Sequence, residues 1–508
     1  RDGDLTMLYG VGAVAGGWAD TKSYSIGRDN LLLAGVTSVA NGEVSANQPF
    51  NLSVTAKGEV IVEFLHDTAL TVAGVERPVR SGLHALPDSE ALAKDLLRRA
   101  RADWAAAVDQ PALDRADRAA SSATRGAAQL RLPVRDVKQL REVKLREDEA
   151  PVWLVTGADG VTAFDLAGKQ LWQFLPGAAC GALAVADVDS DGAAEVIVGS
   201  DDQRVYLLDA AGRERWHYDC EATLGGDPPV PDEIYVVDLD QNGGRDIVVA
   251  ANFVHVLQPD GSVRWEDYWR FQRNRKVGDV HALDFADIDG DGRLDIAAGI
   301  RLNYSVALAW NSDGKRIYPR DPAGQPDHKP LRVHLPNDVL TLDLFADGGP
   351  PQLVVAANDE LSLRWTGGDR DTLSGGDFSG GVVALSAVRK KAGRPLVVAA
   401  TDMGALFAYR ATGDRKDGLK IGWETAWRQI LGDPIMVLNQ ETAGDRPWIL
   451  AGTRNGSARA VDSFDGQTRL RLPATGMPVV AAWVARGEFW VAQADGLVRH
   501  LPLNVKTP

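Results

Sequence analysis

Hydrophobic and polar residues alternate over short stretches near the start of this chain. Leu52, Val54, Val60, Val62 and Phe64 alternate with polar residues on either side of a turn at Lys57-Gly58. A period of two is typical of a half-buried antiparallel sheet. We therefore predict a small β-sandwich-like domain over residues 1–86.

The hydrophobic period changes after Pro87. Leu92, Leu96, Ala100, Trp104 and Val108 recur at a spacing of four, as on one face of an amphipathic helix. A polar stretch rich in Ala, Arg and Asp follows. We assign residues 87–126 to this helix and a linker, with the domain boundary near 109–126.

The remainder, residues 127–508, repeats one pattern of strands. Each unit has an apolar strand, a loop, a second strand ending near Gly, a third ending at D-x-x-G, and a fourth with an aromatic residue. The units lie near 137–175, 183–219, 233–269, 280–319, 338–368, 381–428, 434–472 and 477–503. Four-stranded units with a period of about 40 to 50 residues indicate a β-propeller. The predicted fold is mainly β, with an eight-bladed propeller; seven blades is the alternative.

Two features indicate how the units pack. Trp172, Trp216 and Trp265 share one position, which Tyr318 takes in the fourth copy. A recurrent aromatic at one position predicts packing between successive sheets. The last unit stops after three strands, so we expect residues 127–134, "AAQLRLPV", to supply its outer strand and close the ring.

The loop "ADIDGDGRLDIAAG" contains four aspartates directly before an apolar strand. Asp287, Asp289 and Asp291 stand at positions 1, 3 and 5, Gly292 at 6 and Asp295 at 9. Such spacing suits a hard cation surrounded by oxygen, although an EF-hand would need a glutamate at position 12 and flanking helices. Asp and Gly also favour ordinary turns.

Recurrence favours calcium over the turn interpretation, because two other loops keep the same oxygen positions. The predicted calcium ligands are Asp187, Asp189, Asp191, Glu195, Asp238, Asp240, Asn242, Asp246, Asp287, Asp289, Asp291 and Asp295. A fourth loop keeps Asp343 and Asp347 but has Phe345 at position 3. We expect that loop to be metal-free or weak.

Composition limits the partners and the compartment. The net charge of -15 over 508 residues argues against nucleic acid as the main partner. No stretch approaches the roughly 18 apolar residues of a membrane span. The chain begins with Arg1 without a signal-peptide pattern, and we interpret it as a processed or excerpted piece of a longer precursor. Calcium loops of modest affinity suit a secreted, extracellular or periplasmic location.

A basic and aromatic loop between the third and fourth units is the candidate ligand site. Aromatic rings can stack on sugars, and arginines can bind carboxylate or sulfate groups. The alternative is that the aromatic residues fill a blade junction and the arginines pair with acids. The candidate residues are Tyr268, Trp269, Arg270, Phe271, Arg273, Arg275, Lys276 and His281.

The acidic loops leading into "VIVGS", "IVVAA" and "IAAGI" resemble FG-GAP or VCBS-type propeller repeats, and the D-x-x-G-x-x-x-W endings resemble pyrroloquinoline-quinone-type blades. The resemblance covers residues 150–503 and implies an extracellular, calcium-stabilised platform for adhesion or for binding sugars or proteins. Residues 1–86 are similar in texture to the β-sandwich tails of secreted polysaccharide-degrading enzymes, but no catalytic motif of those enzymes is present.

We therefore expect a calcium-binding scaffold for a polysaccharide, as the C-terminal part of a larger carbohydrate-active protein. A cell-surface adhesion or protein-interaction module is an alternative. The enzymatic alternative is a polysaccharide lyase using polar residues near blade ends: His217, Tyr218, His281, Tyr304, His334 and Asn337. A quinone-dependent dehydrogenase is disfavoured because the chain has no vicinal cysteine pair. Cys180 and Cys220 could form a disulfide or remain two buried thiols.

Overall fold

The structure is a computed structural model. It describes residues 6–9, 23–26, 31–55, 58–64, 67–107, 128–220, 228–267, 270–271, 275–276, 279–300, 306–318, 337–356, 361–364, 372–374, 381–389, 393–402, 404–414, 422–443 and 446–503.

The first eight strands form one sheet. It has the order β1-β2-β3-β4-β5-β8, while β6 pairs with β4 and with β7. The strands are β1 (Thr6–Tyr9), β2 (Ser23–Ile26), β3 (Leu31–Val39), β4 (Val44–Val54), β5 (Val60–Phe64), β6 (Thr68–Val72), β7 (Val75–Val79) and β8 (Gly82–Ala85), with a 3-10 helix η1 (Ala40–Gly42) after β3.

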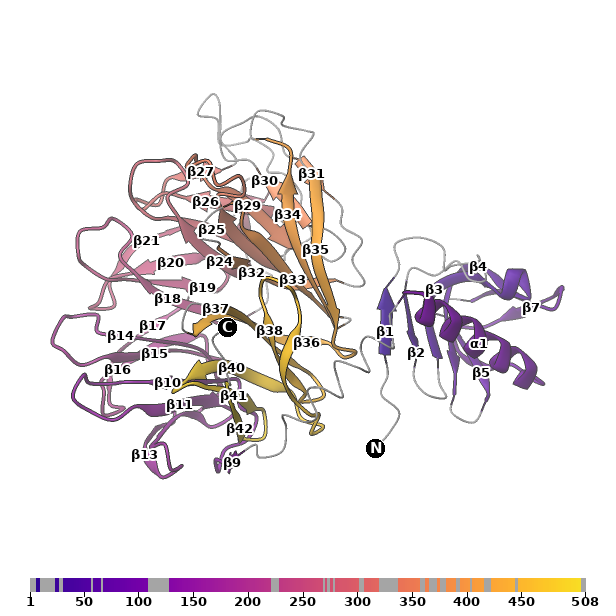
Figure 1. Cartoon of the computed structure of the whole chain (residues 1–508), viewed down its shortest axis with the longest axis horizontal. Helices are drawn as coiled ribbons and strands as arrows, with labels where there is room; N and C mark the ends of the chain where they lie inside the picture. The colour runs from indigo at the N-terminus through magenta and orange to yellow at the C-terminus, as the bar shows by residue number, and fades with distance from the viewer. Residues whose placement is uncertain are drawn as a thin grey trace.

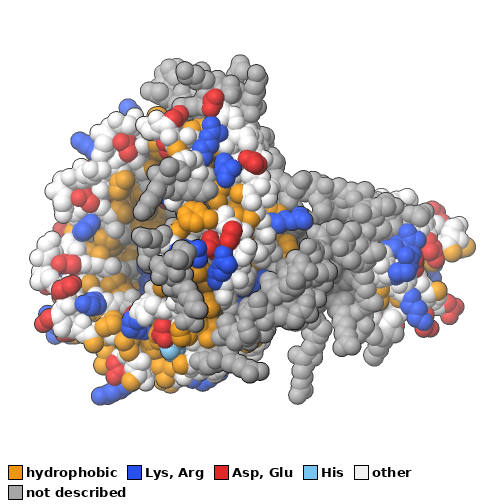
Figure 2. Space-filling view, viewed as in Figure 1, with side chains coloured by type: hydrophobic (Ala, Val, Ile, Leu, Met, Phe, Trp, Pro, Cys, Tyr) orange, Lys and Arg blue, Asp and Glu red, His pale blue; other side chains and the backbone are white. Residues whose placement is uncertain are grey.

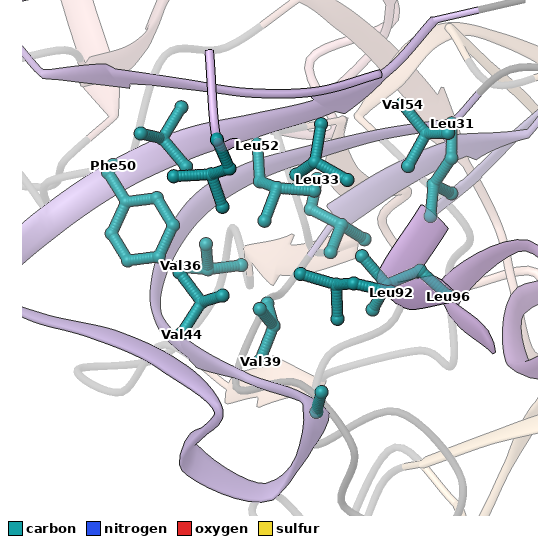
Figure 3. Packing of buried hydrophobic residues seen from close by; sticks show 14 of the residues in the cluster. Leu31, Leu33, Val36, Val39, Val44, Phe50, Leu52, Val54, Leu92 and Leu96 are labelled. Atoms are coloured by element: carbon teal, nitrogen blue, oxygen red, sulfur yellow. The ribbon is translucent and has the colours of Figure 1, made fainter. Parts of the chain in front are cut away.

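Helix α1 (Glu90–Ala107) covers the apolar face of this sheet. Leu92 and Leu96 of the helix pack among side chains of β3 and β4 such as Leu33, as Figure 3 shows. The predicted β-sandwich-like domain or remnant is therefore not confirmed, because the described strands form one sheet and a helix covers its apolar face. Within the described residues, none of the helical segments is long and apolar enough to span a membrane.

Eight four-stranded antiparallel sheets follow, each overlapping one predicted unit. In the first four, the strands are β10 (Gln139–Val143), β11 (Val152–Gly157), β12 (Gly160–Phe164), β13 (Gln170–Phe174); β14 (Cys180–Ala186), β15 (Glu195–Ser200), β16 (Arg204–Leu208), β17 (Glu214–Asp219); β18 (Glu233–Val237), β19 (Asp246–Ala250), β20 (Val254–Leu257), β21 (Val263–Asp267); and β24 (Val280–Ala286), β25 (Asp295–Ile300), β26 (Val306–Trp310), β27 (Arg316–Tyr318).

The remaining sheets contain β28 (Asp338–Leu342), β29 (Gln352–Ala356), β30 (Leu361–Arg364), β31 (Thr372–Ser374); β32 (Val382–Val388), β33 (Leu396–Thr401), β34 (Ala405–Thr412), β35 (Gly422–Ile430); β36 (Ile435–Ala443), β37 (Arg446–Thr453), β38 (Ala458–Asp462), β39 (Thr468–Leu472); and β40 (Val479–Ala485), β41 (Glu488–Gln493), β42 (Leu497–Pro502) together with β9 (Ala128–Arg131). A separate two-stranded sheet pairs β22 (Arg270–Phe271) with β23 (Arg275–Lys276).

The four-stranded sheets follow one another around a ring, from β10–β13 to β40–β42 (Figure 1). The first strands of successive sheets are neighbours: β14 lies beside β18, β24 beside β28, and β36 beside β40. Apolar clusters fill the spaces between sheets, such as the one that joins Val248 and Val256 to Ile296 and Leu308. The hydrophobic core is therefore divided among the junctions of the ring.

The outer strand of the last sheet comes from before the first sheet. In β9, Leu130 pairs with Val498 of β42. The side chain of Leu130 also approaches Gly168, in the turn between β12 and β13, and leaves only 3.3 Å to a Cβ built on that glycine. The segment expected at 127–134 thus pairs with the eighth sheet and contacts the first.

The recurrent tryptophans pack between successive sheets, as predicted. Trp172 stacks over Gly212 of the next sheet, and its indole Nε1 donates to the carbonyl oxygen of Ala210 at 3.1 Å. Gly212 has φ +77°, and a Cβ there would lie 2.4 Å from the ring, so glycine meets both a backbone and a space requirement. Trp216 and Trp265 make the same contact with Gly261 and Gly314.

Candidate metal centre

The three acidic loops connect the first and second strands of three neighbouring sheets: β14–β15, β18–β19 and β24–β25. Each loop is folded by its position 1 aspartate, which accepts the backbone N–H of the glycine at position 6. The Oδ2–N distances are 3.0 Å for Asp187, 2.9 Å for Asp238 and 3.0 Å for Asp287. The aspartate and glycine positions thus determine the turn itself.

The acid at position 9 of each loop is the first residue of the strand that follows the loop, and it is buried. Glu195, Asp246 and Asp295 are only 2%, 6% and 0% exposed. Each accepts the backbone N–H of position 2, from Val188 at 3.0 Å, Leu239 at 3.3 Å and Ile288 at 2.7 Å. Burying a carboxylate costs free energy unless a positive group compensates its charge. Since one oxygen of each acid bonds to the backbone, the partner of the other oxygen determines how that charge is compensated.

Among the described residues, two groups of carboxylates converge as metal ligands could. Asp187, Asp189 and Glu195 each bring an oxygen within 4.8 Å of the others, and so do Asp287, Asp289 and Asp291. The remaining predicted ligands of these two loops, Asp191 and Asp295, lie outside those tight groups. Two of the three predicted loops therefore gather acidic oxygens at metal-binding spacing.

In each of the first two loops, the acids pair with an arginine from the fourth strand of the same sheet. Arg215 Nη1 lies 2.7 Å from Asp189 Oδ2 and 3.0 Å from Glu195 Oε1. The hydrogen bond from Arg215 lowers the pKa of Asp189. In the second loop, Arg264 contacts both oxygens of Asp246, at 2.8 and 2.7 Å, and reaches Asp240 at 2.9 Å.

The third loop differs because one buried oxygen has no partner. Asp295 Oδ2 accepts the N–H groups of Ile288 and Asp289, whereas its Oδ1 is buried and makes no hydrogen bond with any residue that the structure describes. Burial raises the pKa of Asp295 to about 7, and the charges of Asp289 and Asp291 add to the rise. Asp295 Oδ1 is thus a buried acceptor without a partner in the loop where Asp287, Asp289 and Asp291 converge, and hard cations such as Ca²⁺ bind carboxylate oxygens.

The fourth loop, expected to be metal-free or weak, contains a neutral group at the buried site. Gln352 Oε1 accepts the N–H of Leu344 at 2.9 Å, and its Nε2 donates to the carbonyl oxygen of Pro350 at 2.7 Å. Asp343 still accepts the N–H of Gly348 at 2.9 Å. The fourth loop thus keeps the same turn, but the neutral amide of Gln352 stands where the other loops have a buried carboxylate.

The predicted basic and aromatic loop is described only in part. Arg270, Phe271, Arg275 and Lys276 lie in the paired strands β22 and β23, and Tyr268, Trp269 and Arg273 lie outside the described residues. His281 is on β24, where its Nδ1 lies 3.8 Å from Asp232. On the face seen in Figure 2, acidic and basic side chains are interspersed among the described residues.

The proposed lyase residues make separate contacts where the structure describes them. His217 Nδ1 lies 2.8 Å from Glu214, Tyr218 Oη lies 3.2 Å from His255 Nδ1, and Asn337 donates to the carbonyl oxygen of Val382 at 2.6 Å. Tyr304 and His334 lie outside the described residues. Cys180 and Cys220 are both buried free thiols.

Sequence reasoning missed a row of acids on the first strands of the sheets. Glu233 accepts the N–H of Leu283 at 3.0 Å, Asp284 accepts the hydroxyl of Thr341 at 2.6 Å, and Asp338 accepts the N–H of Leu385 at 2.6 Å. Burial raises the pKa of Glu233 to about 8, with Asp338 adding to it. Their only sequence signal is an acid in an otherwise apolar strand.

Comparison with known proteins supports the fold. The sequence model of the family described as outer membrane protein assembly factor BamB matches residues 157–277. Together with the ring of four-stranded sheets, this match identifies a β-propeller with PQQ-like repeats. No curated protein matches the sequence of this chain.

Several solved structures are similar to the chain at low sequence identity. Sqt1 of Saccharomyces cerevisiae is 14% identical, with a TM-score of 0.52 over 74% of this chain and 97% of that one. BamB from Moraxella catarrhalis is 16% identical, with a TM-score of 0.47 over 75% and 98%. The computationally designed Ika8 protein is 15% identical, with a TM-score of 0.49 over 73% and 98%.

Proposed function

We propose that this chain is an extracytoplasmic scaffold: an eight-bladed propeller, closed by β9, that binds a partner protein and is stabilised by calcium in its acidic loops. The eight four-stranded sheets and the contact of Leu130 with Gly168 support the closed ring. The family match over residues 157–277 supports the comparison with an outer membrane assembly factor. A periplasmic location would suit both the family match and calcium.

The unpartnered Oδ1 of Asp295 carries the calcium proposal. This oxygen is buried in a loop where Asp287, Asp289 and Asp291 already converge. These four residues would hold the ion, which would supply the missing positive charge and stiffen the connection between β24 and β25. The loops beginning at Asp187 and Asp238 keep the same oxygen positions and are the further candidates.

Thermal melting with calcium and with a chelator tests the proposal. Calcium that binds only the folded chain should raise the melting temperature, by an amount that grows with free calcium. Magnesium at the same ionic strength is the control for general salt effects. Equal melting in calcium, magnesium and chelator would show that the aspartates are turn formers only.

Protein binding rests on the absence of a converged catalytic set among the described lyase candidates and on the family match. Affinity capture from an extracytoplasmic membrane extract tests it, with an unrelated propeller as the control bait. A specific partner should be retained by this chain alone and then bind it when purified. If the two baits retain the same proteins, the scaffold proposal is wrong.

Polysaccharide binding is the second candidate, because the β22–β23 hairpin interleaves basic and aromatic residues between the third and fourth sheets. Alginate retardation in gels is a direct test. The double variant Arg270→Ala, Arg275→Ala should migrate freely, whereas the same changes at the Asp-paired Arg204 and Arg213 should not affect retardation. Unretarded wild type would remove this candidate.

A further inference from the structure

The two arginines that contact the acidic loops, Arg215 and Arg264, occupy the same position on the fourth strands of their sheets, β17 and β21. In the second sheet, Trp216 pairs with Leu207 and Glu214 with Leu208, so Arg215 is the extra residue of a bulge. Arg264 is the extra residue at the same place in the third sheet, between Val263 and Trp265. A bulge re-aims one side chain, and here it directs both arginines to the position 9 acid.

The fourth sheet has the same bulge but an apolar residue in it. Tyr318 pairs with Ala309 and Arg316 with Trp310, which leaves Ile317 as the extra residue. Ile317 packs against the apolar cluster between the fourth and fifth sheets. No guanidinium therefore reaches Asp295 from this position.

The other arginines near the third loop bind elsewhere. Arg293 lies 3.6 Å from Asp313, and Arg316 Nη2 lies 2.6 Å from Asp267. Asp295 Oδ1 has no hydrogen-bond partner among the described residues, these two arginines included. Among the described residues, the buried acid at position 9 thus pairs with an arginine in the first two loops but not in the third.

The fourth loop shows what happens when the charge itself is removed. Gln352 bonds to the same position 2 N–H as the acids do, and satisfies its own amide through Pro350. The four loops therefore share one turn but differ at the buried position, which holds an acid paired with an arginine, an acid whose second oxygen has no described partner, or a neutral amide. Only the second leaves an unmatched negative group.

From this series we infer that the guanidinium groups of Arg215 and Arg264 take the place of the metal ion in the loops that they contact, so that, of the three acidic loops, only the one from Asp287 to Asp295 binds calcium. A guanidinium offers fixed donors to two carboxylates and cannot dissociate. This inference rests on the proposed calcium binding and narrows it from three loops to one.

Isothermal titration of the full chain with calcium chloride, in metal-free buffer, tests the inference. The wild type should bind one ion. Ile317→Arg should abolish binding, because the new guanidinium would occupy the loop, while Ile317→Leu keeps it. Arg215→Gln should raise the stoichiometry to two by opening the Asp187, Asp189, Glu195 group.

Melting without calcium and circular dichroism check that each variant is folded. If Arg215→Gln is unfolded in chelator, recovery of its fold by calcium counts as the gained site. Three ions in the wild type, or unchanged binding by Ile317→Arg, would overturn the arginine inference and leave calcium binding intact. Absence of any binding by the wild type would instead contradict the proposed calcium function.

Discussion

At the scale of single residues, the molecule depends on how buried carboxylates are neutralised. A carboxylate taken out of water needs hydrogen bonds and a positive partner, or it takes up a proton. Glu195 and Asp246 have arginines, whereas Asp295 has only backbone donors for one of its oxygens. Acidic residues at the same loop position therefore differ in how their negative charge is compensated.

Replacing Asp289 by Asn should remove the calcium response. The amide keeps an acceptor for the N–H of Asp291 but removes one negative charge from the Asp287, Asp289, Asp291 group. A site saturated at 100 times its Kd stabilises the fold by about 2.7 kcal/mol. Melting in calcium and in chelator should therefore coincide for Asp289→Asn. Asp240→Asn, at the same position in the arginine-containing second loop, is the matched control and should keep the wild-type response.

Glu233 should make stability depend on pH. Burial raises its folded pKa from 4.5 to about 8, so between these values the folded state binds a proton that the unfolded state has released. The free energy of unfolding then falls as pH rises, by up to about 1.4 kcal/mol per unit. Relative to wild type, Glu233→Gln should gain melting temperature from pH 5 to 8. A constant difference across this range would show that the carboxyl of Glu233 does not titrate there.

At the scale of elements, successive sheets are joined by a tryptophan placed on a glycine. The aromatic ring lies over the turn of the next sheet, and its N–H bonds to a carbonyl of that turn, as between Trp172 and Ala210. Trp427 repeats the arrangement with Gly466 and Ser463 near the far end of the ring. Each junction that contains such a tryptophan thus combines apolar burial with one directional hydrogen bond.

Gly212→Ala should weaken the junction between the first two sheets. The added methyl would meet the Trp172 ring at 2.4 Å and hold a side chain at positive φ. Positive φ costs about 1–2 kcal/mol, and overpacking adds about 1–3 kcal/mol. Gly177→Ala is the control, since Gly177 has φ +94° with nothing within 4 Å. Chemical denaturation should show a larger loss for Gly212→Ala; equal losses would mean that the backbone alone sets the cost.

Local patterns in the sequence predicted the repeating elements well, because each unit contains its own signals. The D-x-x-G turns, the tryptophans and the acidic loops are all short-range features, and each appears where its pattern placed it. The helix at Glu90–Ala107 was also predicted, but not its packing on the first sheet. Arg215 and Glu233 were missed because their partners are distant in sequence or in another sheet.

At the scale of the whole molecule, the ring joins the two ends of its own repeat region. β9 precedes the first sheet but pairs with β42 of the last, and Leu132 donates its N–H to Gly496 at 2.9 Å. Closure of this kind removes an exposed sheet edge and links the first and last sheets. The N-terminal sheet has its own core with α1, and its described strands, β1 to β8, pair only with one another.

Removal of β9 should therefore open the ring, whereas removal of the N-terminal sheet should not. A chain beginning at residue 127 keeps Leu130 and Leu132, while one beginning at residue 135 loses both and exposes the edge of β42. Leu132 is buried and Leu130 is partly buried, so the second chain should be less stable by about 1.5–3 kcal/mol for Leu132 and by a smaller amount for Leu130. A peptide of residues 127–134 should restore its melting temperature when added in excess, since the missing strand is a separate segment. If both chains melt alike and the peptide has no effect, β9 lies on the last sheet without holding the ring together.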